Sequence, residues 1–457
     1  MSDGRIPGSF RDPGGFLYRR KGKLLRQVNP SCADDLQLLE DSGLYDLLVD
    51  KGLLIPHTRM PLDQALTSSA AAVIAPELVP FVSYPYEWCF SQLQDAALTT
   101  LRIQKLALAR GMTLKDASAY NIQFHRGRPV LIDTLSLTAY REDSPWVAYR
   151  QFCQHFLAPL ALMAKVDVRL SALLRIHIDG VPLDLASGLL PWRTRLSPGL
   201  LMHLHAHASS QKKHERKAVS PRAVKVSRKS LLNIVDNLRG TIAGLRWRAG
   251  ETQWGDYYHD TNYSDRAMDA KKEMVGALLA ECGPTSVWDL GANDGTFSRL
   301  AADAGILTVA ADIDPVAVEN NWRRVRMDRE EFLLPLLMDL SNPSPALGWA
   351  HSERRSLLQR GPADCVLALA LIHHLALTNN VPLANAADFF ATAGDHLIIE
   401  FVPKEDSQVQ RLLASREDVF PDYRREGFEQ AFEERFVIRR QEEIPGTRRT
   451  LYLMDRR

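Results

Sequence analysis

Apolar positions form two kinds of pattern along this chain. In the C-terminal half, short apolar runs recur, and each has the length of one buried strand in a parallel sheet. Segments with apolar residues at helical spacing lie between them, as Phe297, Leu300 and Ala301 illustrate. This alternation predicts an α/β domain, which a final antiparallel hairpin closes. The predicted strands are Thr285 to Leu290, Leu307 to Ala311, Leu334 to Leu337, Asp364 to Leu371, His396 to Phe401, Phe436 to Arg440 and Thr450 to Met454.

The N-terminal half mixes hairpins with longer helical segments, which predicts a separate α+β domain. Two strands, Phe16 to Arg20 and Leu24 to Val28, flank a turn that contains Gly22. A second hairpin turns at Gly127. Helical periodicity covers Ala33 to Lys51, Trp88 to Arg110 and much of Trp146 to Leu190.

A basic stretch separates the two halves. Within 206–230, Lys and Arg residues crowd together with almost no acidic residues. Such a run suits a contact with RNA or an anionic lipid, but it lacks aromatic side chains for stacking on bases, so we interpret it as a solvated linker. A chain of 457 residues is long enough for two or three domains. We therefore expect an N-terminal domain over 1–205, the basic linker over 206–230 and a second domain over 231–457.

The amino-acid composition indicates the class of protein, its expected partners and its expected compartment. The apolar fraction of 46% and the charged fraction of 24% are those of a globular protein. A net charge of +1 creates no overall field for nucleic acid, which we do not expect as a partner. Five cysteines, widely spread and without metal-ligand spacing, favour free thiols in the cytoplasm. The N-terminus does not resemble a signal peptide, and no apolar stretch predicts a membrane span.

The residues with the clearest chemical meaning follow the first strand of the C-terminal half. The turn from Gly291 to Gly295 comes directly after Asp289 and Leu290. Glycine lets the backbone approach a ligand where a Cβ atom would collide with it. The next strand is followed by Asp312, whose carboxylate can accept hydrogen bonds from both hydroxyls of a ribose. The turn does not have the G-x-G-x-x-G pattern of nicotinamide-binding folds.

These residues resemble motifs I and II of class I S-adenosylmethionine-dependent methyltransferases, with Asn293 in place of the usual middle glycine. The resemblance implies a Rossmann-like, seven-stranded methyltransferase sheet and S-adenosyl-L-methionine as the cofactor. It also implies that Asp339, an acid after the third strand, contacts the adenine amino group. The cofactor-binding residues are then Asp289, Gly291, Asn293, Gly295, Asp312 and Asp339.

Two histidines follow the fourth strand, where the sequence resembles the family motif that faces the transferable methyl group. A sulfonium methyl is already activated, so the protein mainly has to align the reacting atoms. An acceptor that keeps its proton at neutral pH also needs a base, and His373 or His374 suits that role. We expect the two rings to point apart, so that at most one is catalytic. The alternative is that both histidines are structural.

Other side chains could contribute to the same site. Four aromatic residues fall within 254–263, ahead of the first strand of the sheet. Of these, Tyr257, Tyr258 and Tyr263 could line the substrate side, or they could pack a covering segment onto the sheet. Glu400 and Tyr258 are the alternative bases if neither histidine takes the proton.

The N-terminal half carries a second resemblance. Asp116, Asn121 and Asp133 have the spacing of the catalytic base and the two magnesium ligands in kinases of the aminoglycoside-phosphotransferase type. The resemblance implies a kinase-like domain that binds ATP and Mg, with Asn121 and Asp133 holding the metal. The sequence departs from that family because Arg26 stands in place of the usual lysine and Thr134 follows Asp133. The alternative is that these polar residues only cap turns.

The whole chain resembles a poorly characterised set of bacterial methyltransferases, some of which are labelled as nodulation proteins. That label points to a glycan or another small molecule as the substrate. We therefore predict methyl transfer from S-adenosylmethionine to an O or N atom of such an acceptor. Two alternatives stay open, a bifunctional kinase–methyltransferase and a non-enzymatic cofactor-binding scaffold. The intact motif residues Asp289, Gly291, Gly295 and Asp312 argue against the scaffold.

Overall fold

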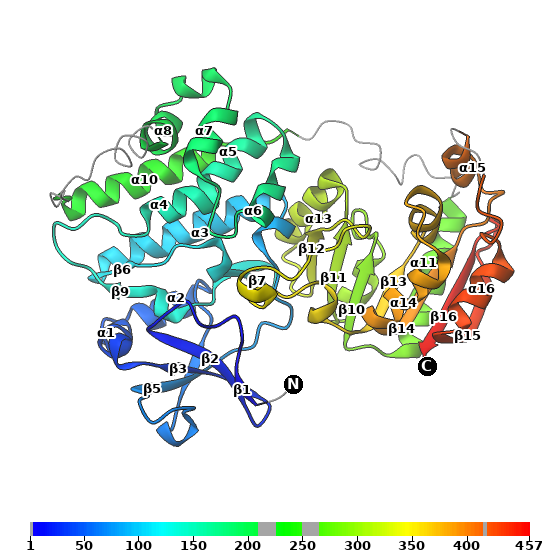
Figure 1. Cartoon of the computed structure of the whole chain (residues 1–457), viewed down its shortest axis with the longest axis horizontal. Coiled ribbons are helices and arrows are strands. Elements are labelled where there is room, and N and C mark those ends of the chain that lie inside the picture. Colours follow the sequence, from blue (N-terminus) through cyan, green and yellow to red (C-terminus); the bar gives the residue numbers. More distant parts are fainter. Residues whose placement is uncertain (1–2, 209–224, 249–264, 415–417) are drawn as a thin grey trace. The chain divides into compact units, whose positions relative to one another are not determined.

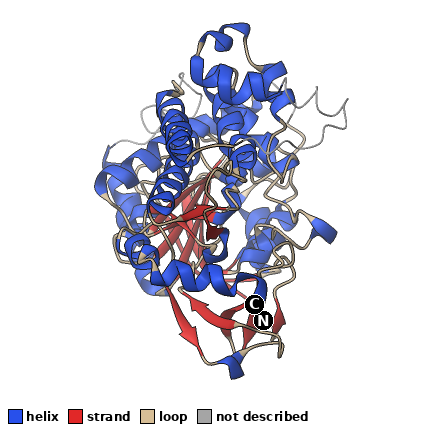
Figure 2. Ribbon diagram, turned by 90° about the vertical axis from the view of Figure 1, so that its left-hand side faces the viewer, coloured by secondary structure: helices blue, strands red, loops and turns tan. Residues whose placement is uncertain are grey.

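A computed structural model, drawn in Figure 1, describes residues 3–208, 225–248, 265–414 and 418–457. The chain divides into two compact units, and Figure 2 shows their helices and strands. The first unit comprises Met1–Arg248 and the short segment Leu347–Arg354. The second comprises Ala249–Ala346 and Arg355–Arg457. Within the described ranges, none of the helices is both long and apolar enough to cross a bilayer.

The first unit combines small antiparallel sheets with a mostly helical region. Its larger sheet has five strands in the order β1-β2-β3-β5-β4, and two further pairs join β6 with β9 and β7 with β8. The strands are β1 (Gly4–Arg5), β2 (Gly15–Arg20), β3 (Lys23–Val28), β4 (His57–Met60), β5 (Ala72–Pro76), β6 (Met112–Leu114), β7 (Ile122–His125), β8 (Arg128–Leu131) and β9 (Leu137–Ala139). The helices are α1 (Ala33–Asp41), α2 (Leu44–Asp50), α3 (Phe90–Ala109), α4 (Tyr149–Phe152), α5 (Ala158–Lys165), α6 (Leu173–Ile176), α7 (Leu183–Leu189), α8 (Pro198–Leu200) and α10 (Arg228–Gly244).

Helix α10 packs along α3 within the first unit. An ion pair between Lys105 and Asp236 (2.8 Å) and a hydrogen bond from the Gln94 amide to the carbonyl of Ile242 join the two helices. The sequence analysis assigned the α10 segment to the second domain. The structure instead buries its apolar stripe, so the boundary between the units follows this helix. The stripe consists of Leu231, Val235, Leu238 and Ile242.

The second unit is built on one seven-stranded sheet with the order β12-β11-β10-β13-β14-β16-β15. Neighbouring strands from β12 to β14 are parallel, whereas β16 runs antiparallel to both β14 and β15. This confirms the predicted α/β class and the closing antiparallel hairpin. The strands are β10 (Ser286–Leu290), β11 (Leu307–Asp312), β12 (Leu333–Leu337), β13 (Ala363–Ala368), β14 (Gly394–Phe401), β15 (Phe436–Glu443) and β16 (Thr450–Arg456). The helices are α11 (Asp265–Cys282), α12 (Ser298–Ala302), α13 (Pro315–Asp328), α14 (Leu383–Ala393), α15 (Ser407–Leu413) and α16 (Arg425–Glu433).

Alternation along the strands sorts side chains between the two faces of this sheet. On β16, Leu451 and Leu453 join a core with residues of α11 and α12. Tyr452 lies between them in sequence and contacts the ring of Phe428 on α16, with centroids 5.2 Å apart. Parallel strands such as β12 and β13 are buried on both faces and mostly apolar, which is why they were recognisable in the sequence.

Two predicted elements are interrupted, in each case by a residue with positive φ. The predicted helix Ala33 to Lys51 is two helices, because Gly43 has φ +66° between α1 and α2. The predicted strand Asp364 to Leu371 ends at Ala368, because Ala370 has φ +50° and turns the chain. The two histidines that follow therefore lie on a helical turn and not on the strand end itself.

Candidate functional site

The predicted cofactor residues meet at the carboxyl edge of β10 and β11. The backbone amides of Gly291 and Ala292 donate to the carbonyl of Ala311, which fastens the turn after β10 to β11. The amide of Asn293 donates to the Asp312 carboxylate at 2.7 Å. The glycine turn and the acid of the second strand are therefore joined directly by hydrogen bonds.

The turn requires glycine at both of its ends. Gly291 and Gly295 have φ angles of +81° and +78°, which strain any residue with a side chain. A Cβ atom on Gly291 would lie 3.2 Å from the side chain of Leu371, and one on Gly295 would lie 2.5 Å from the amide of Asn321. The turn thus packs tightly between the segment after β13 and helix α13.

Two carboxylates flank this turn, and neither forms an ion pair within the described residues. Asp289 accepts a hydrogen bond from the Ser298 hydroxyl at 2.6 Å, while Asp312 accepts from the amides of Asn293 and Asp314. Burial raises the pKa of Asp289 to about 7 and the pKa of Asp312 to about 6. A carboxylate has about four lone-pair positions, so Asp312 can accept further hydrogen bonds from a ligand.

Asp339 lies two residues beyond β12, beside the end of β11. The Met338 amide donates to the carbonyl of Asp312 at 2.7 Å and ties the two strand ends together. The Asp339 carboxylate accepts from the amide and the hydroxyl of Ser341 at 2.8 and 2.6 Å. Ile313, next to Asp312, is 57% exposed and offers an apolar surface at this edge. The sequence analysis missed Ile313, although an apolar residue between two aspartates marked it.

His373 and His374 follow β13 on a helical turn. Their ring centroids are 4.0 Å apart, so the prediction that the rings point apart is wrong. Neighbouring residues are about 100° apart around a helix, whereas opposite directions belong to a strand. His373 is fully buried, and neither of its ring nitrogens has a hydrogen-bond partner in the described part of the chain. Burial lowers the pKa of His373 well below its usual value and the pKa of His374 to about 4.

Buried charged side chains of the second unit form a network that influences the pKa of His373. Lys271 on α11 pairs with Glu400 near the end of β14 at 2.6 Å. Arg449 pairs with Glu400 at 3.2 Å and with Asp406 at 2.7 Å. Burial lowers the pKa of Lys271, and Glu400 opposes that shift. The positive charges of Lys271 and Arg449 add to the burial that lowers the pKa of His373.

Of this network, the sequence analysis named only Glu400. Lys271 is in register with Ala267 and Val275 on the buried face of α11, so the helical spacing carried a signal of its burial. Arg449 precedes β16 and had no comparable signal. The aromatic residues expected on the substrate side lie outside the described residues; they are Tyr257, Tyr258 and Tyr263.

In the first unit, the residues of the kinase-type pattern are engaged with other side chains. The Asp133 carboxylate pairs with Arg26 at 2.6 Å, and the Asn121 amide donates to the Ser136 hydroxyl at 3.1 Å. Burial raises the pKa of Asp116. Across the described ranges, no group of three or more His, Cys, Asp or Glu side chains could hold a metal ion. Magnesium binding by Asn121 and Asp133 therefore stays a prediction.

Comparison with known proteins gives the family. No family model matches the chain. The nodulation protein NoeA of Rhizobium meliloti (strain 1021) is 36% identical over 461 residues, covering 99% of this chain and 96% of that protein. The chain belongs to the NoeA family. Because the match runs over nearly the whole length of both proteins, the NoeA family includes both units.

Three solved methyltransferase structures are similar over less than half of the chain. Magnesium protoporphyrin IX methyltransferase ChlM from Synechocystis PCC 6803 is 16% identical, covers 46% of this chain and 87% of its own, and has a TM-score of 0.31. The N-methyltransferase NodS from Bradyrhizobium japonicum WM9 is 12% identical, with 42% and 98% covered and a TM-score of 0.31. The bifunctional kinase-methyltransferase WbdD is 15% identical, with 44% and 41% covered and a TM-score of 0.31.

Proposed function

We propose that the second unit transfers a methyl group from S-adenosylmethionine to an O or N atom of a small molecule or glycan. The observation that carries this proposal is the junction between the turn from Gly291 to Gly295 and Asp312. The turn and the acid lie at the ends of adjacent parallel strands, β10 and β11, and a hydrogen bond joins them. Ligands of open α/β sheets bind outside this edge, where the strands end.

The residues at this edge suit a nucleoside with a cationic substituent. Asp312 keeps lone pairs for the two hydroxyls of a ribose, and Ile313 offers an apolar surface on which a flat base can lie. Asp289 is a buried carboxylate without a cationic partner at ion-pair distance in the described ranges, and it lies at the start of the turn. Its raised pKa reflects this uncompensated burial, which a positively charged ligand would relieve.

We assign the acceptor side to His373. Bound S-adenosylmethionine would supply an electrophilic methyl group on a positively charged sulfur. The chain then has to orient the acceptor and receive its proton. The His373 imidazole is neutral at pH 7, because its pKa is well below the usual value, and both of its nitrogens lack partners within the described residues. A buried polar group without a partner is costly, so its retention supports a role toward a ligand.

The acceptor class rests on the family. The matched relative is named as a nodulation protein, and the sequence resemblance to such proteins implies a glycan or another small molecule. The pairing of Asp133 with Arg26 gives no support to phosphotransfer in the first unit. We therefore propose methyl transfer alone.

Calorimetric titration with S-adenosylmethionine tests this proposal. Asp312→Ala should weaken binding about 10- to 100-fold, because hydrogen bonds to a charged group are worth about 1.5–3 kcal/mol. Asp303→Ala, an exposed aspartate after α12, is the matched control and should bind like wild type. Equal affinities of wild type and Asp312→Ala would refute the cofactor assignment. The acceptor can then be sought as a methyl group lost from the metabolites of a deletion strain.

A further inference from the structure

The first unit carries an exposed apolar surface around residues 185–202. Trp192 and Leu196, on the short 3-10 helix η8 (Trp192–Leu196), are 70% and 73% exposed. The flanking elements α7 and η9 (Leu201–Ala206) pack against each other, and η8 packs on η9. We call this surface the apolar patch; its members are Leu185, Leu189, Trp192, Leu196, Leu201 and Met202.

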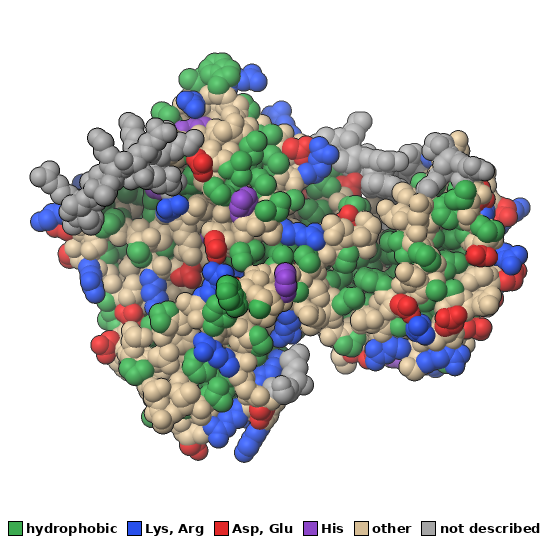
Figure 3. All heavy atoms as spheres, viewed as in Figure 1, with side chains coloured by type: hydrophobic (Ala, Val, Ile, Leu, Met, Phe, Trp, Pro, Cys, Tyr) green, Lys and Arg blue, Asp and Glu red, His purple; other side chains and the backbone are tan. Residues whose placement is uncertain are grey.

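The local structure orients η8 so that its apolar residues face outward. Thr194, between the two most exposed residues of the patch, is buried; its hydroxyl donates to the carbonyl of Pro191 and lies 2.9 Å from a ring nitrogen of His205. Polar contacts thus anchor the inner side of the helix, while Trp192 and Leu196 project away from it. Figure 3 shows hydrophobic side chains with Lys and Arg beside them at the top of the view, over the region of α7 and α8.

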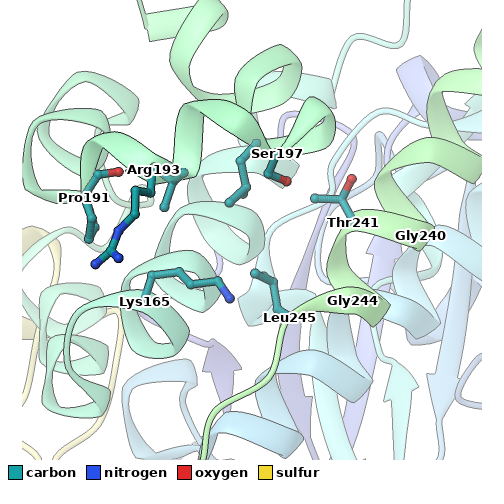
Figure 4. A pocket seen from close by; sticks show the side chains of 10 residues that line it. Lys165, Pro191, Arg193, Ser197, Gly240, Thr241, Gly244 and Leu245 are labelled. Atoms are coloured by element: carbon teal, nitrogen blue, oxygen red, sulfur yellow. Dashed lines mark hydrogen bonds between the residues drawn. The ribbon is translucent and has the colours of Figure 1, made fainter.

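Cationic side chains accompany the patch. Lys165 and Arg193 line a cavity of about 510 Å³ beneath η8, together with Ser197 and Thr241 (Figure 4). Arg195 lies on the same short helix. In the described part of the chain, none of these three cations forms an ion pair, and the acid nearest in sequence to the patch is Asp184 on α7.

The basic character continues along the sequence beyond the patch. Residues 185–229 contain ten Lys and Arg residues but a single acid, Glu215. This excess stands out in a chain whose overall net charge is only +1. In the sequence, the basic stretch interpreted above as a solvated linker directly follows the residues of the apolar patch.

We propose that the apolar patch, with the cations Lys165, Arg193 and Arg195 beside it, binds the surface of an anionic phospholipid membrane. Trp192 and Leu196 enter the interfacial region, where a tryptophan ring is favourable, and the cations lie over the phosphate groups. A monomer rarely exposes such a patch without an interaction to match it. This inference concerns where the protein works and is independent of the proposed methyl transfer.

The charges favour a lipid surface over two other occupants. A second copy of the chain would bring identical basic surfaces together, and like charges repel. RNA would use the cations but would leave leucine and methionine side chains without a partner, and Trp192 is the patch's single aromatic for base stacking. An anionic membrane satisfies the apolar and the cationic residues together.

Vesicle co-sedimentation of the full chain tests the proposal. Wild type should sediment with phosphatidylcholine vesicles that contain phosphatidylglycerol, much less with phosphatidylcholine alone, and less as salt is added, because screening weakens the charge term. The double variant Trp192→Ser/Leu196→Ser should lower the partition coefficient about tenfold or more. Arg193→Gln/Arg195→Gln should also lower it about tenfold.

Two matched control variants remove an exposed apolar side chain and an exposed cation that do not belong to the apolar patch. Met327→Ser removes a 76%-exposed apolar side chain from α13, and Arg411→Gln removes an exposed cation from α15. Both should bind vesicles like wild type, and thermal melting checks that every variant is folded. The proposal is overturned if wild type does not bind anionic vesicles, or if the patch variants bind as tightly as the controls. Two further results would identify another occupant when vesicle binding is absent. The patch variants could abolish a dimer seen by sedimentation velocity, or they could abolish RNA binding measured by filter retention; either result overturns the proposal.

Discussion

Two aspartates lie at or just beyond strand ends, one in each unit, yet they have opposite surroundings. In the first unit, Asp133 is neutralised by Arg26 at 2.6 Å. In the second, Asp312 accepts hydrogen bonds from the backbone amides of Asn293 and Asp314 and has no cation at ion-pair distance within the described residues. The first carboxylate is satisfied by its own protein. The second retains acceptor capacity, and burial raises its pKa to about 6.

The presence or absence of a paired cation distinguishes Asp133, which forms a structural pair with Arg26, from Asp312, which belongs to a candidate ligand site. A buried carboxylate without a cation makes the folded protein less stable at neutral pH, because the charged form is poorly solvated. Such groups cluster at functional sites, where a ligand supplies what the protein does not. By this criterion, we propose a ligand at the edge formed by β10 and β11, whereas the pairing of Asp133 with Arg26 gives no support to a ligand at Asp133. Each experiment below either sharpens this contrast or breaks it.

The largest expected effect is on the rate of methyl transfer. His373→Asn should lower turnover by roughly 10²–10⁴-fold with nearly unchanged cofactor affinity, because the loss lies in the transition state. Since the pKa of His373 is well below its usual value, the wild-type rate should not fall between pH 8 and pH 6 through protonation of this imidazole. Turnover per folded molecule, measured as S-adenosylhomocysteine formed with the identified acceptor, provides the readout.

His374→Asn is the matched control, because its ring lies 4.0 Å from that of His373. It should reduce turnover by less than about tenfold, short of the range for a general base. If both variants melt earlier but keep near-normal turnover, the histidines are structural. Glu400 would then be the next base to examine, although it already pairs with Lys271 and Arg449.

The second experiment concerns the stability of the first unit. Arg26→Met removes the cation from Asp133, which is largely buried, and should lower the free energy of unfolding by about 2 kcal/mol. Asp133→Asn in the same chain should recover more than half of that loss, because the remaining side chain is neutral. Urea denaturation of the two single variants and the double variant measures the coupling. Additive effects would show that the pair does not stabilise the fold.

Much of the second unit could be predicted because burial on both faces makes parallel strands such as β11, β12 and β13 mostly apolar. The run from Leu307 to Ala311 illustrates this, since β11 spans Leu307–Asp312. The glycine turn was equally readable, because its positive φ angles require specific residues. Short-range sequence patterns were therefore enough to predict an element wherever its backbone conformation requires a particular residue type.

Contacts between distant segments could not be predicted. The ion pairs of Glu400 join α11, β14 and the segment before β16, and nothing local links Lys271 to Arg449. The assignment of Leu347–Arg354 to the first unit has the same cause. There the Arg11 guanidinium donates to the buried Glu353 carboxylate at 2.6 Å, across more than 300 residues of sequence.

A smaller effect is expected from pH. The pKa values of about 7 for Asp289 and about 6 for Asp312 are raised from 3.8, so both groups destabilise the cofactor-free fold increasingly as pH rises from 3.8, until pH exceeds these raised values. Cofactor binding needs the ionised forms and should change in the opposite direction. Affinity for S-adenosylmethionine should fall about tenfold from pH 8 to pH 5 through Asp312 alone.

Asp289→Asn separates the two carboxylates. It should make the melting temperature of the cofactor-free protein less dependent on pH between 5 and 8, since one of the two raised pKa values is gone. Cofactor affinity measured by calorimetry should keep the part of its pH dependence that belongs to Asp312. An affinity independent of pH in the wild type would mean that neither carboxylate changes its protonation on binding.

The smallest expected effect is that of ATP with magnesium on the full chain. Ligand binding raises the melting temperature in proportion to its binding free energy, and at 100 times Kd the gain is about 2.7 kcal/mol. Because Arg26 holds the Asp133 carboxylate at 2.6 Å, we expect millimolar Mg-ATP to leave the melting temperature of the wild type within about 1 °C. A rise of several degrees that Asp133→Asn abolishes would break the contrast between the two aspartates and restore a nucleotide site in the first unit.

Arg26→Gln sharpens the question, because it frees the carboxylate. If this variant alone gains stability from Mg-ATP, the arginine blocks a metal site that the fold still contains; if it gains none, the first unit has no such site and Asp133 serves the fold.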